Sequence, residues 1–139
     1  WGPGVERLPT DSAIRAHHHG EAWGHGMYEI LHNAKIAVNR HIDVAENYAN
    51  NMRLYEATGV GTMLITDAKN NLNELFEAGK EVETYASKEE LVQKIRYYLA
   101  HPEERTKIAQ AGQRRTLKDH TYKKRMEELA ALLQNYVKN

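Results

Sequence analysis

The chain has 139 residues and no formal net charge, because 19 lysine and arginine residues balance 19 aspartate and glutamate residues. The length suffices for one domain with a sizeable core. The neutral charge argues against a protein that binds nucleic acid through bulk positive charge. The chain has no cysteine, which excludes disulfides and zinc–thiolate sites. No apolar run approaches the ~20 residues of a membrane span, so we expect a cytoplasmic protein without a membrane-spanning segment.

The first 86 residues alternate short apolar runs with helical patterns. Residues 1–22 are rich in Gly, Pro, Asp, Ser and His, which predicts a loop-rich start. Helical spacing of apolar residues predicts a helix over residues 23–34. The short apolar runs that predict strands are 35–39, 62–66 and 82–85. Between the strands we expect a polar loop to residue 46, a helix over 46–58 and a short helix over 70–76.

Three helices are predicted after residue 86. The segment Ser87-Lys-Glu-Glu90 is a capping box, in which the Ser hydroxyl and the Glu carboxylate satisfy free N–H groups at the start of a helix. This helix stops near Pro102, because the residue before a proline disfavours helical backbone. Pro102 suits the first turn of the next helix, which runs to about residue 119. The last helix, over residues 122–137, has one apolar face, so we expect it to pack on another surface.

Strands that alternate with helices predict an α/β domain: a parallel sheet with helices on both faces. Three strands are few for such a sheet. Trp1 directly precedes the turn signal Gly2-Pro-Gly4 and resembles the end of a strand. We therefore expect residues 1–139 to be one domain excised from a longer chain and lacking its N-terminal strands. Its β/α core is expected over residues 23–86 and its C-terminal helices over residues 87–139.

Segments over nearly the whole chain share the order and spacing of one family. They are HGEAWG at 19–24, IAVNRH at 36–41, NNMRLYEATG at 50–59, NLNELF at 71–76, GKEV at 79–82, PEER at 102–105, AGQ at 111–113 and HTY at 120–122. Together they resemble the C-terminal part of a group 1 glycosyltransferase, most closely the CgeB-like spore-maturation branch. The resemblance implies half of a GT-B enzyme, in which two Rossmann-like domains enclose the active site in a cleft.

The resemblance also implies a role for this half. It binds the nucleotide-sugar donor, from which a glycosyl (hexosyl-type) group passes to an unidentified acceptor. The N-terminal GT-B domain, which holds most acceptor contacts, is the expected partner, and the present chain alone is expected to be inactive. Such enzymes usually need no metal ion, because helix N-termini and basic side chains stabilise the leaving diphosphate. We therefore expect no cofactor and no metal site.

If the chain is a donor-binding half, as the resemblance implies, particular residues are expected at the donor site. The helix predicted from residue 46 follows a strand, so its free N–H groups and positive dipole end point toward the carboxyl ends of the strands, where a pyrophosphate can bind. Arg40, His41 and Arg53 are expected to add positive charge there. Glu56 matches the glutamate of a Glu-Ala-x-x-x-Gly pattern, which in related enzymes accepts both ribose hydroxyls.

Other positions depart from many group 1 enzymes. Tyr48 stands where they have a glutamate that contacts the transferred sugar, so the sugar and the stereochemical outcome stay open. Asn50 and Asn51 replace Phe-Gly, and we expect their amides to take over donor contacts. His19 is expected near the donor phosphate by the same resemblance. The histidine run 17–19 predicts no metal site, because adjacent side chains cannot converge and no carboxylate or cysteine stands at ligand spacing.

Two other function classes stay open. The chain could be a non-catalytic sugar-nucleotide-binding module, for which Tyr48 is the best argument. It could also be a Rossmann-like protein-interaction domain, which would leave Glu56 and the paired asparagines unexplained but is compatible with the fold. Nucleotide binding distinguishes the first two classes from the third. The sequence identifies neither the nucleotide nor the acceptor.

Overall fold

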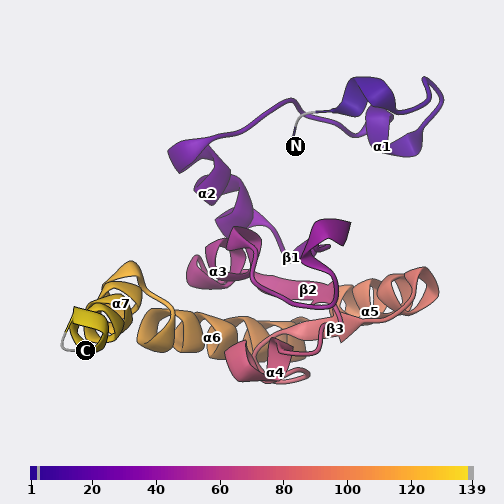
Figure 1. Cartoon of the computed structure of the whole chain (residues 1–139). Helices are drawn as coiled ribbons and strands as arrows, with labels where there is room; N and C mark the ends of the chain where they lie inside the picture. The colour runs from indigo at the N-terminus through magenta and orange to yellow at the C-terminus, as the bar shows by residue number, and fades with distance from the viewer. Residues whose placement is uncertain (3, 138–139) are drawn as a thin grey trace.

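A computed structural model describes residues 1–2 and 4–137; Pro3, part of the turn predicted after Trp1, lies outside the described residues. Within them the chain is an α/β protein with a sheet of three strands in the order β1-β2-β3 (Figure 1). The strands are β1 (Ile36–Asn39), β2 (Met63–Asp67) and β3 (Glu83–Tyr85). Both neighbouring pairs are parallel. The prediction of a parallel sheet is confirmed.

Most helices lie where the sequence predicts them; the exceptions are the start of α3 and the short helix α1, which lies in the segment predicted as a loop. They are α1 (Ala13–Ala16), α2 (Gly24–Asn33), α3 (Met52–Gly59), α4 (Leu72–Leu75), α5 (Lys88–Ala100), α6 (Pro102–Asp119) and α7 (Tyr122–Val137), with short 3-10 turns at Val5–Arg7 and Asp43–Ala45. The capping box is present at α5, where Glu90 N–H donates to Ser87 Oγ (3.1 Å) and Ala86 N–H donates to Glu90 Oε2 (2.7 Å).

The central strand β2 has helices on both faces. Leu64 packs in a hydrophobic cluster with residues of α3 and α4. Its neighbours Met63 and Ile65 point the other way and pack in a second cluster with residues of α5 and α6. Both clusters exclude water from β2, which confirms a Rossmann-like parallel sheet covered on both faces.

Helix α6 packs on α3 and on the loop that precedes β3, and the contact with the loop requires a glycine. A Cβ atom at Gly112 would lie 2.3 Å from the backbone oxygen of Glu81, so a side chain at this position would force α6 away from the loop that precedes β3. Beside it, the hydroxyls of Thr58 in α3 and Thr116 in α6 are 2.6 Å apart and buried. This buried contact holds α3 and α6 at close range.

The prediction of a helix from residue 46 is wrong, because α3 begins at Met52. Glu46 adopts φ 50° and ψ −123°, which is not helical. Asn47 is engaged by the loop after β2: its carbonyl accepts from Asn70 N–H (3.0 Å), and its side-chain amide donates to Asn70 Oδ1 (2.7 Å). Asparagine side chains compete with helical hydrogen bonds in this way, so the chain stays irregular until Asn51.

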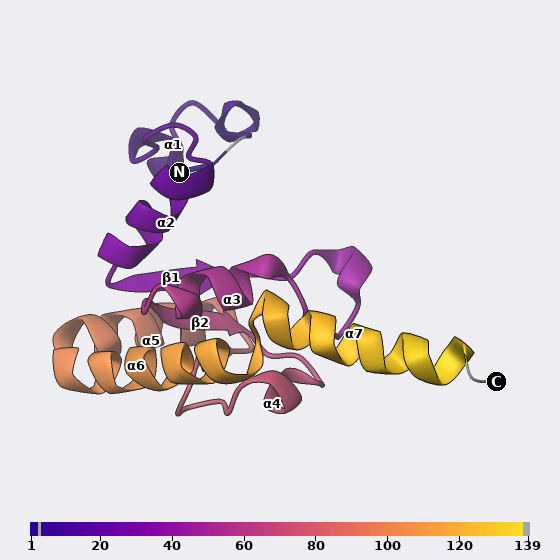
Figure 2. The same ribbon diagram turned by 90° about the vertical axis from the view of Figure 1, so that its left-hand side faces the viewer.

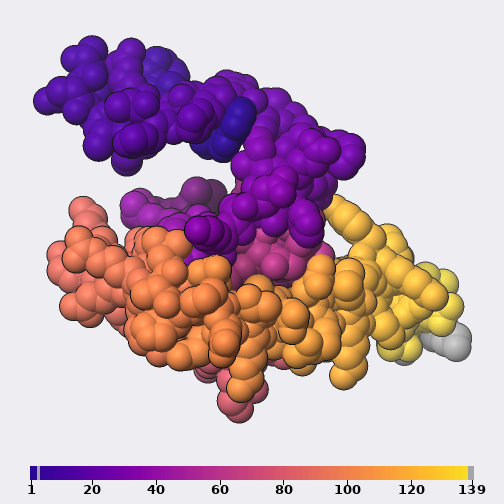
Figure 3. All heavy atoms as spheres, turned by 180° about the vertical axis from the view of Figure 1, so that it is seen from behind, coloured from indigo at the N-terminus to yellow at the C-terminus, as the bar shows by residue number. Residues whose placement is uncertain are grey.

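Two segments project from the body formed by the sheet and its helices. The N-terminal segment, residues 1–2 and 4–22, stands apart from the sheet, and a space-filling view shows an open gap between this indigo segment and the body (Figure 3). Helix α7 extends away at the other end (Figure 2). It contains no buried residue, so its apolar face is exposed. No helix in the described ranges has both the length and the apolar character that crossing a membrane requires.

A buried carboxylate joins β3 to α5. Glu83 accepts hydrogen bonds from Tyr98 OH (2.8 Å), Thr84 N–H (2.8 Å) and Lys94 Nζ (3.0 Å). Burial alone raises the pKa of Glu83, but these hydrogen bonds outweigh it, so the pKa lies below its ordinary value. Burial and the bond to Glu83 raise the pKa of Tyr98. The stabilisation from ionised Glu83 is therefore complete above its ordinary pKa of 4.5 and is lost as the pH falls through the lower folded-state value.

Tyr98→Phe is expected to lower the free energy of unfolding by about 1–2 kcal/mol at pH 7, because the buried Glu83 carboxylate loses one donor. The loss should shrink in acid, as Glu83 becomes protonated. Urea unfolding at several pH values measures both effects. The control is Tyr97→Phe, next in the chain, whose exposed hydroxyl bonds Glu104 (2.9 Å) and whose removal should change little. Equal losses from the two variants would contradict a role for the Glu83 network.

Candidate functional site

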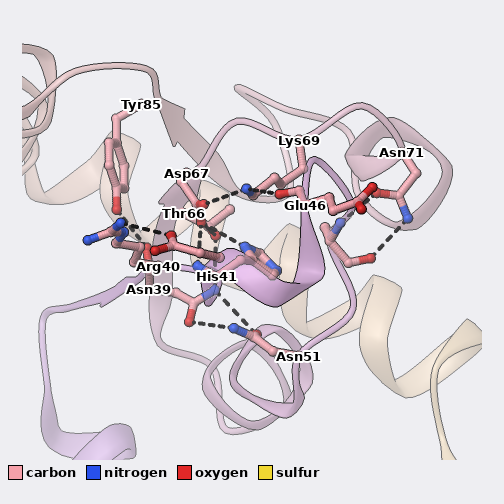
Figure 4. Close-up of polar contacts among 12 residues, drawn as sticks. Asn39, Arg40, His41, Glu46, Asn51, Thr66, Asp67, Lys69, Asn71 and Tyr85 are labelled. Carbon is pink, nitrogen blue, oxygen red and sulfur yellow. Dashed lines mark hydrogen bonds and ion pairs between the residues drawn. The ribbon is translucent and has the colours of Figure 1, made fainter.

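Polar side chains gather where the three strands end (Figure 4). Asn39 ends β1, Asp67 ends β2 and Tyr85 ends β3. The Tyr85 hydroxyl donates to the backbone carbonyl of Asn39 (3.0 Å) and so links the two outer strands. We call this group the strand-end cluster; its members are Asn39, His41, Asn51, Thr66, Asp67, Lys69 and Tyr85. Open parallel sheets bind ligands outside the carboxyl ends of their strands, which makes this cluster the first candidate site.

The centre of the cluster is a pair formed by His41 and Asp67. The Nδ1 atom of His41 lies 2.7 Å from Asp67 Oδ1, and the backbone N–H of His41 donates to the same oxygen (3.0 Å). The ammonium group of Lys69 lies 3.4 Å from Asp67 Oδ2. Partial burial raises the pKa of Asp67, but the bonds from His41 and Lys69 outweigh it and hold this pKa below its ordinary value. Asp67 is therefore an ionised acceptor that orients the His41 ring.

The other ring nitrogen of His41 is an exception to ordinary hydrogen bonding. The side chain is only 1% exposed, and Nε2 is buried without a hydrogen-bond partner among the residues that the structure describes. Because ionised Asp67 can only accept, Nδ1 of His41 carries a proton and donates to it. An unpaired buried polar atom such as Nε2 costs about 1–3 kcal/mol. Such groups are rare in folded proteins and often mark a functional site.

Two asparagine amides join the end of β1 to the start of α3. Asn51 Nδ2 donates to Asn39 Oδ1 (3.0 Å), and Asn39 Nδ2 donates to Thr66 Oγ1 (3.0 Å). Asn51 is the N-cap residue of α3, yet its side chain makes no capping bond to the helix. The first N–H groups of α3 therefore lack the usual side-chain acceptor, and the positive end of the helix dipole lies beside the strand-end cluster. This end of α3 suits an anionic ligand.

The loop between β1 and α3 is held by the loop that follows β2. Lys69 Nζ donates to the backbone carbonyl of Glu46 (2.8 Å). Ala49 exchanges two hydrogen bonds with the side chain of Asn71 (2.6 and 2.9 Å). Glu46 has a positive φ that a non-glycine residue rarely adopts, and this contact with Lys69 helps to hold it there.

Three of the predicted site residues lie at or near this loop. Asn51 belongs to the cluster itself. Arg40 follows β1, is exposed, and pairs with Asp43 (3.2 Å). Tyr48 is also exposed, on the loop that leads to α3. The structure thus places Arg40 and Asn51 around the strand ends and leaves the Tyr48 ring open to solvent.

Three others lie on α3 or just before it. The Arg53 guanidinium is 3.2 Å from Glu56 Oε2, and the Glu56 side chain is only 13% exposed. Asn50 precedes the helix and accepts a hydrogen bond from Tyr55 OH (3.0 Å). Glu56 and Asn50 line one cavity, of about 550 Å³, between α2, α3 and the junction of α6 with α7. This cavity follows the helix away from the strand-end cluster.

The structure does not bring His19 to the strand ends. It is exposed in the projecting N-terminal segment, where its ring centroid lies 5.6 Å from that of Trp1. Its neighbour His18 contacts the Gly2 carbonyl (2.7 Å). In the described part of the chain, no three His, Cys, Asp or Glu side chains are grouped so as to hold a metal ion.

Sequence reasoning missed the pairing of His41 with Asp67 and the roles of Lys69 and Tyr85. His41 was expected only to add charge, because its partner is 26 residues away. One signal could have revealed the pairing: Asp67 directly follows a predicted buried strand, at the sheet edge where His41 also lies. Polar residues at that place in two adjacent parallel strands meet.

Asp67→Ala is expected to lower the free energy of unfolding by about 2–3 kcal/mol at neutral pH, because His41 loses an acceptor for its ring and its backbone N–H. The loss should decrease as the pH falls through the lowered pKa of Asp67. Urea unfolding is the measurement. Asp43→Ala, which removes an acid with a 94% exposed side chain on the neighbouring turn, should change stability little. An equal effect of both variants would show that the His41–Asp67 pair is not a structural anchor.

The chain matches a known protein family. Residues 1–131 match the model of a family described as glycosyl transferase-like. No curated protein matches the chain.

Proposed function

Because this chain belongs to the glycosyl transferase-like family, we propose that it binds the nucleotide-sugar donor of a glycosyltransferase. The observation that carries the proposal is the start of α3, where N–H groups without a side-chain cap lie beside the strand-end cluster. Helix N-termini at the carboxyl ends of parallel strands are favourable places for phosphate groups. The family supports glycosyl transfer in general. The sugar nucleotide used in such a reaction carries a diphosphate, which is the anion expected at this helix.

In this proposal the diphosphate binds at the N-terminus of α3. Glycosyl transfer breaks the bond between the sugar C1 atom and a diphosphate oxygen. An acceptor hydroxyl oxygen forms the new bond to C1, and its proton passes to the departing diphosphate. Negative charge grows on the leaving diphosphate, so the N–H groups at Met52 and Arg53 stabilise the transition state if they are held in place beforehand. Arg40, on the loop after β1, adds positive charge by reorienting from its exposed contact with Asp43.

The strand-end cluster supplies the rigidity that this site needs. The Asn39–Asn51 bond fixes the start of α3 relative to β1, and the His41–Asp67 pair fixes the loop between them to β2. A site whose donors are held by a second layer of hydrogen bonds loses little energy to reorganisation. Asn39, Asn51, His41 and Asp67 are therefore assigned as positioning residues.

Glu56 is proposed to bind the ribose hydroxyls. Its side chain is mostly buried on the flank of α3, and within the described residues Arg53 is its ion-pair partner, through Oε2. Oε1 is then the oxygen that accepts from the ribose. Asn50 lines the same cavity and supplies an amide nearby.

We further propose that the chain is the C-terminal half of a GT-B enzyme of the CgeB-like branch and acts in the cytoplasm on a hexosyl donor. An N-terminal domain would supply the acceptor contacts, so the chain alone would be inactive. No metal ion is assigned to the reaction, because helix N–H groups and arginines take the role of neutralising the diphosphate. The competing proposal is a non-catalytic binding module; the exposed Tyr48 in place of a sugar-binding glutamate favours it. Donor hydrolysis with the N-terminal half restored would distinguish the two.

Calorimetric titration with UDP, GDP and dTDP is expected to show binding of at least one nucleotide. Glu56→Ala should weaken that binding at least tenfold, roughly 1.4 kcal/mol, because the ribose loses its carboxylate. Glu103→Ala is the matched control, since it removes one exposed carboxylate from the first turn of α6 and leaves the proposed site intact.

Two outcomes would oppose the proposal. A folded chain that binds none of the three nucleotides would favour the interaction-domain class. Equal affinities of Glu56→Ala and Glu103→Ala would remove the ribose role of Glu56 while leaving the diphosphate site in place.

A further inference from the structure

Helix α7 has an apolar face that no described part of the chain covers. The helix runs from Tyr122 to Val137, a length of about 24 Å, and it extends away from the body of the molecule (Figure 2). Its large apolar side chains are between 46% and 87% exposed; they are Tyr122, Met126, Leu129, Leu132, Leu133, Tyr136 and Val137. A contiguous exposed patch of this kind marks an interaction surface.

Five of these side chains form a stripe with the spacing of a seam between two helices. They follow one another at intervals of four, three, four and three residues, and they are Tyr122, Met126, Leu129, Leu133 and Tyr136. A mean interval of 3.5 residues is the repeat that keeps two α-helices in contact along a shared seam. Packing on a sheet or a loop does not require this repeat. The occupant that fits the stripe is therefore another helix.

The stripe is also nearly symmetric about its middle residue. Along the axis, Met126 lies about 4.5 Å before Leu129, and Leu133 lies about 6 Å after it. Tyr122 and Tyr136 both lie about 10.5 Å from Leu129. When two copies of the helix pair in opposite directions about Leu129, each tyrosine meets a tyrosine. In the same arrangement Met126 meets Leu133. A surface that matches itself in this way fits a twofold-symmetric pair of identical chains.

The charges on α7 favour the antiparallel direction of pairing. Its first turn is basic and holds Lys123, Lys124 and Arg125. Cations at the start of a helix oppose the helix dipole, and Glu127 and Glu128 offset only part of this charge. In a parallel pair the two basic turns would lie side by side and repel each other. In an antiparallel pair each basic turn lies beside the negative dipole end of the other helix, where residues 134–137 carry no charge.

Two copies of this face have the area of a specific interface. A large apolar side chain has roughly 60–120 Å² of apolar surface to remove from water. Seven such side chains on each of two helices, partly exposed as they are, bring together on the order of 1,000 Å², which is the size at which specific interfaces between proteins begin. A second copy of α7 therefore covers the face without any further partner.

We propose that α7 is a dimerisation element, which pairs antiparallel with α7 of a second copy of this chain about a twofold axis at Leu129. The pairing gives α7 the tertiary contacts from which helices in proteins draw most of their stability. It does not depend on donor binding, so the two proposals are tested separately.

Sedimentation equilibrium of the unaltered chain over a series of concentrations is the first test. The mean mass should rise from the 16.0 kDa of one chain toward twice that value. Leu129→Glu puts a charge at the centre of the seam and should weaken association at least tenfold. Leu99→Glu is the matched control, because it alters a leucine of similar exposure on α5 (50% against 46%) and should leave association unchanged. Urea unfolding verifies that both variants fold.

Disulfide formation tests the direction of pairing, since the chain has no cysteine of its own. In an antiparallel pair, the variants Tyr122→Cys and Tyr136→Cys should form a cross-linked dimer only when the two are mixed and oxidised. In a parallel pair, each variant would cross-link with itself.

The other outcomes overturn the inference. A mass that stays at 16.0 kDa throughout the series would mean that another part of a longer chain, or a different protein, covers α7. Association that survives Leu129→Glu, or that Leu99→Glu weakens equally, would place the contact on another surface. Cross-linking of each cysteine variant with itself would contradict the antiparallel arrangement. None of these results bears on whether the chain binds a nucleotide.

Discussion

The burial of β2 is the constraint on which the rest of the structure depends. From Met63 to Thr66 this strand is almost inaccessible to water, because strands lie along both edges and helices cover both faces. Its polar groups must then find partners inside the protein. The Thr66 hydroxyl meets the amide of Asn39, and the Asp67 carboxylate at the strand end meets His41. The strand-end cluster is therefore a direct consequence of a strand that water cannot reach.

Two carboxylates on the sheet also find partners inside the protein, and the consequences differ. Glu83 begins β3 and Asp67 ends β2, and neighbouring donors lower the pKa of each. Glu83 faces α5 and joins a helix to the sheet. Asp67 faces the loop before α3 and sets the geometry of a surface where ligands of parallel sheets bind. The two carboxylates have the same chemistry and differ in their position along the strand. Glu83, at the start of a strand, stabilises the fold, whereas Asp67, at the end of a strand, shapes the candidate site.

Much of this fold could be predicted from the sequence because its signals are local. Apolar runs located the three strands to within a residue or two, and a capping box and a proline located the start of α5 and the boundary with α6. The start of α3 could not be predicted, because Asn47 bonds to a loop 23 residues later and therefore does not join the helix. The His41–Asp67 pair could not be predicted either, because it depends on the register of the sheet. Glu56 was located on α3 correctly, but the cavity beside it is formed by α2, α6 and α7, whose arrangement no single segment encodes.

The way in which helix α7 is attached connects its exposed face to the cavity beside α3. A helix of this length without buried residues gains little stability from the core, and it is held at its first turn by the contact between Arg125 and His120. Tyr122 lies in that same turn and forms part of the cavity wall. Any contact that reorients the exposed apolar face of α7 also moves the wall, and a ligand in the cavity restrains the helix in return. By thermodynamic linkage, a coupling between these two events has the same free energy in both directions.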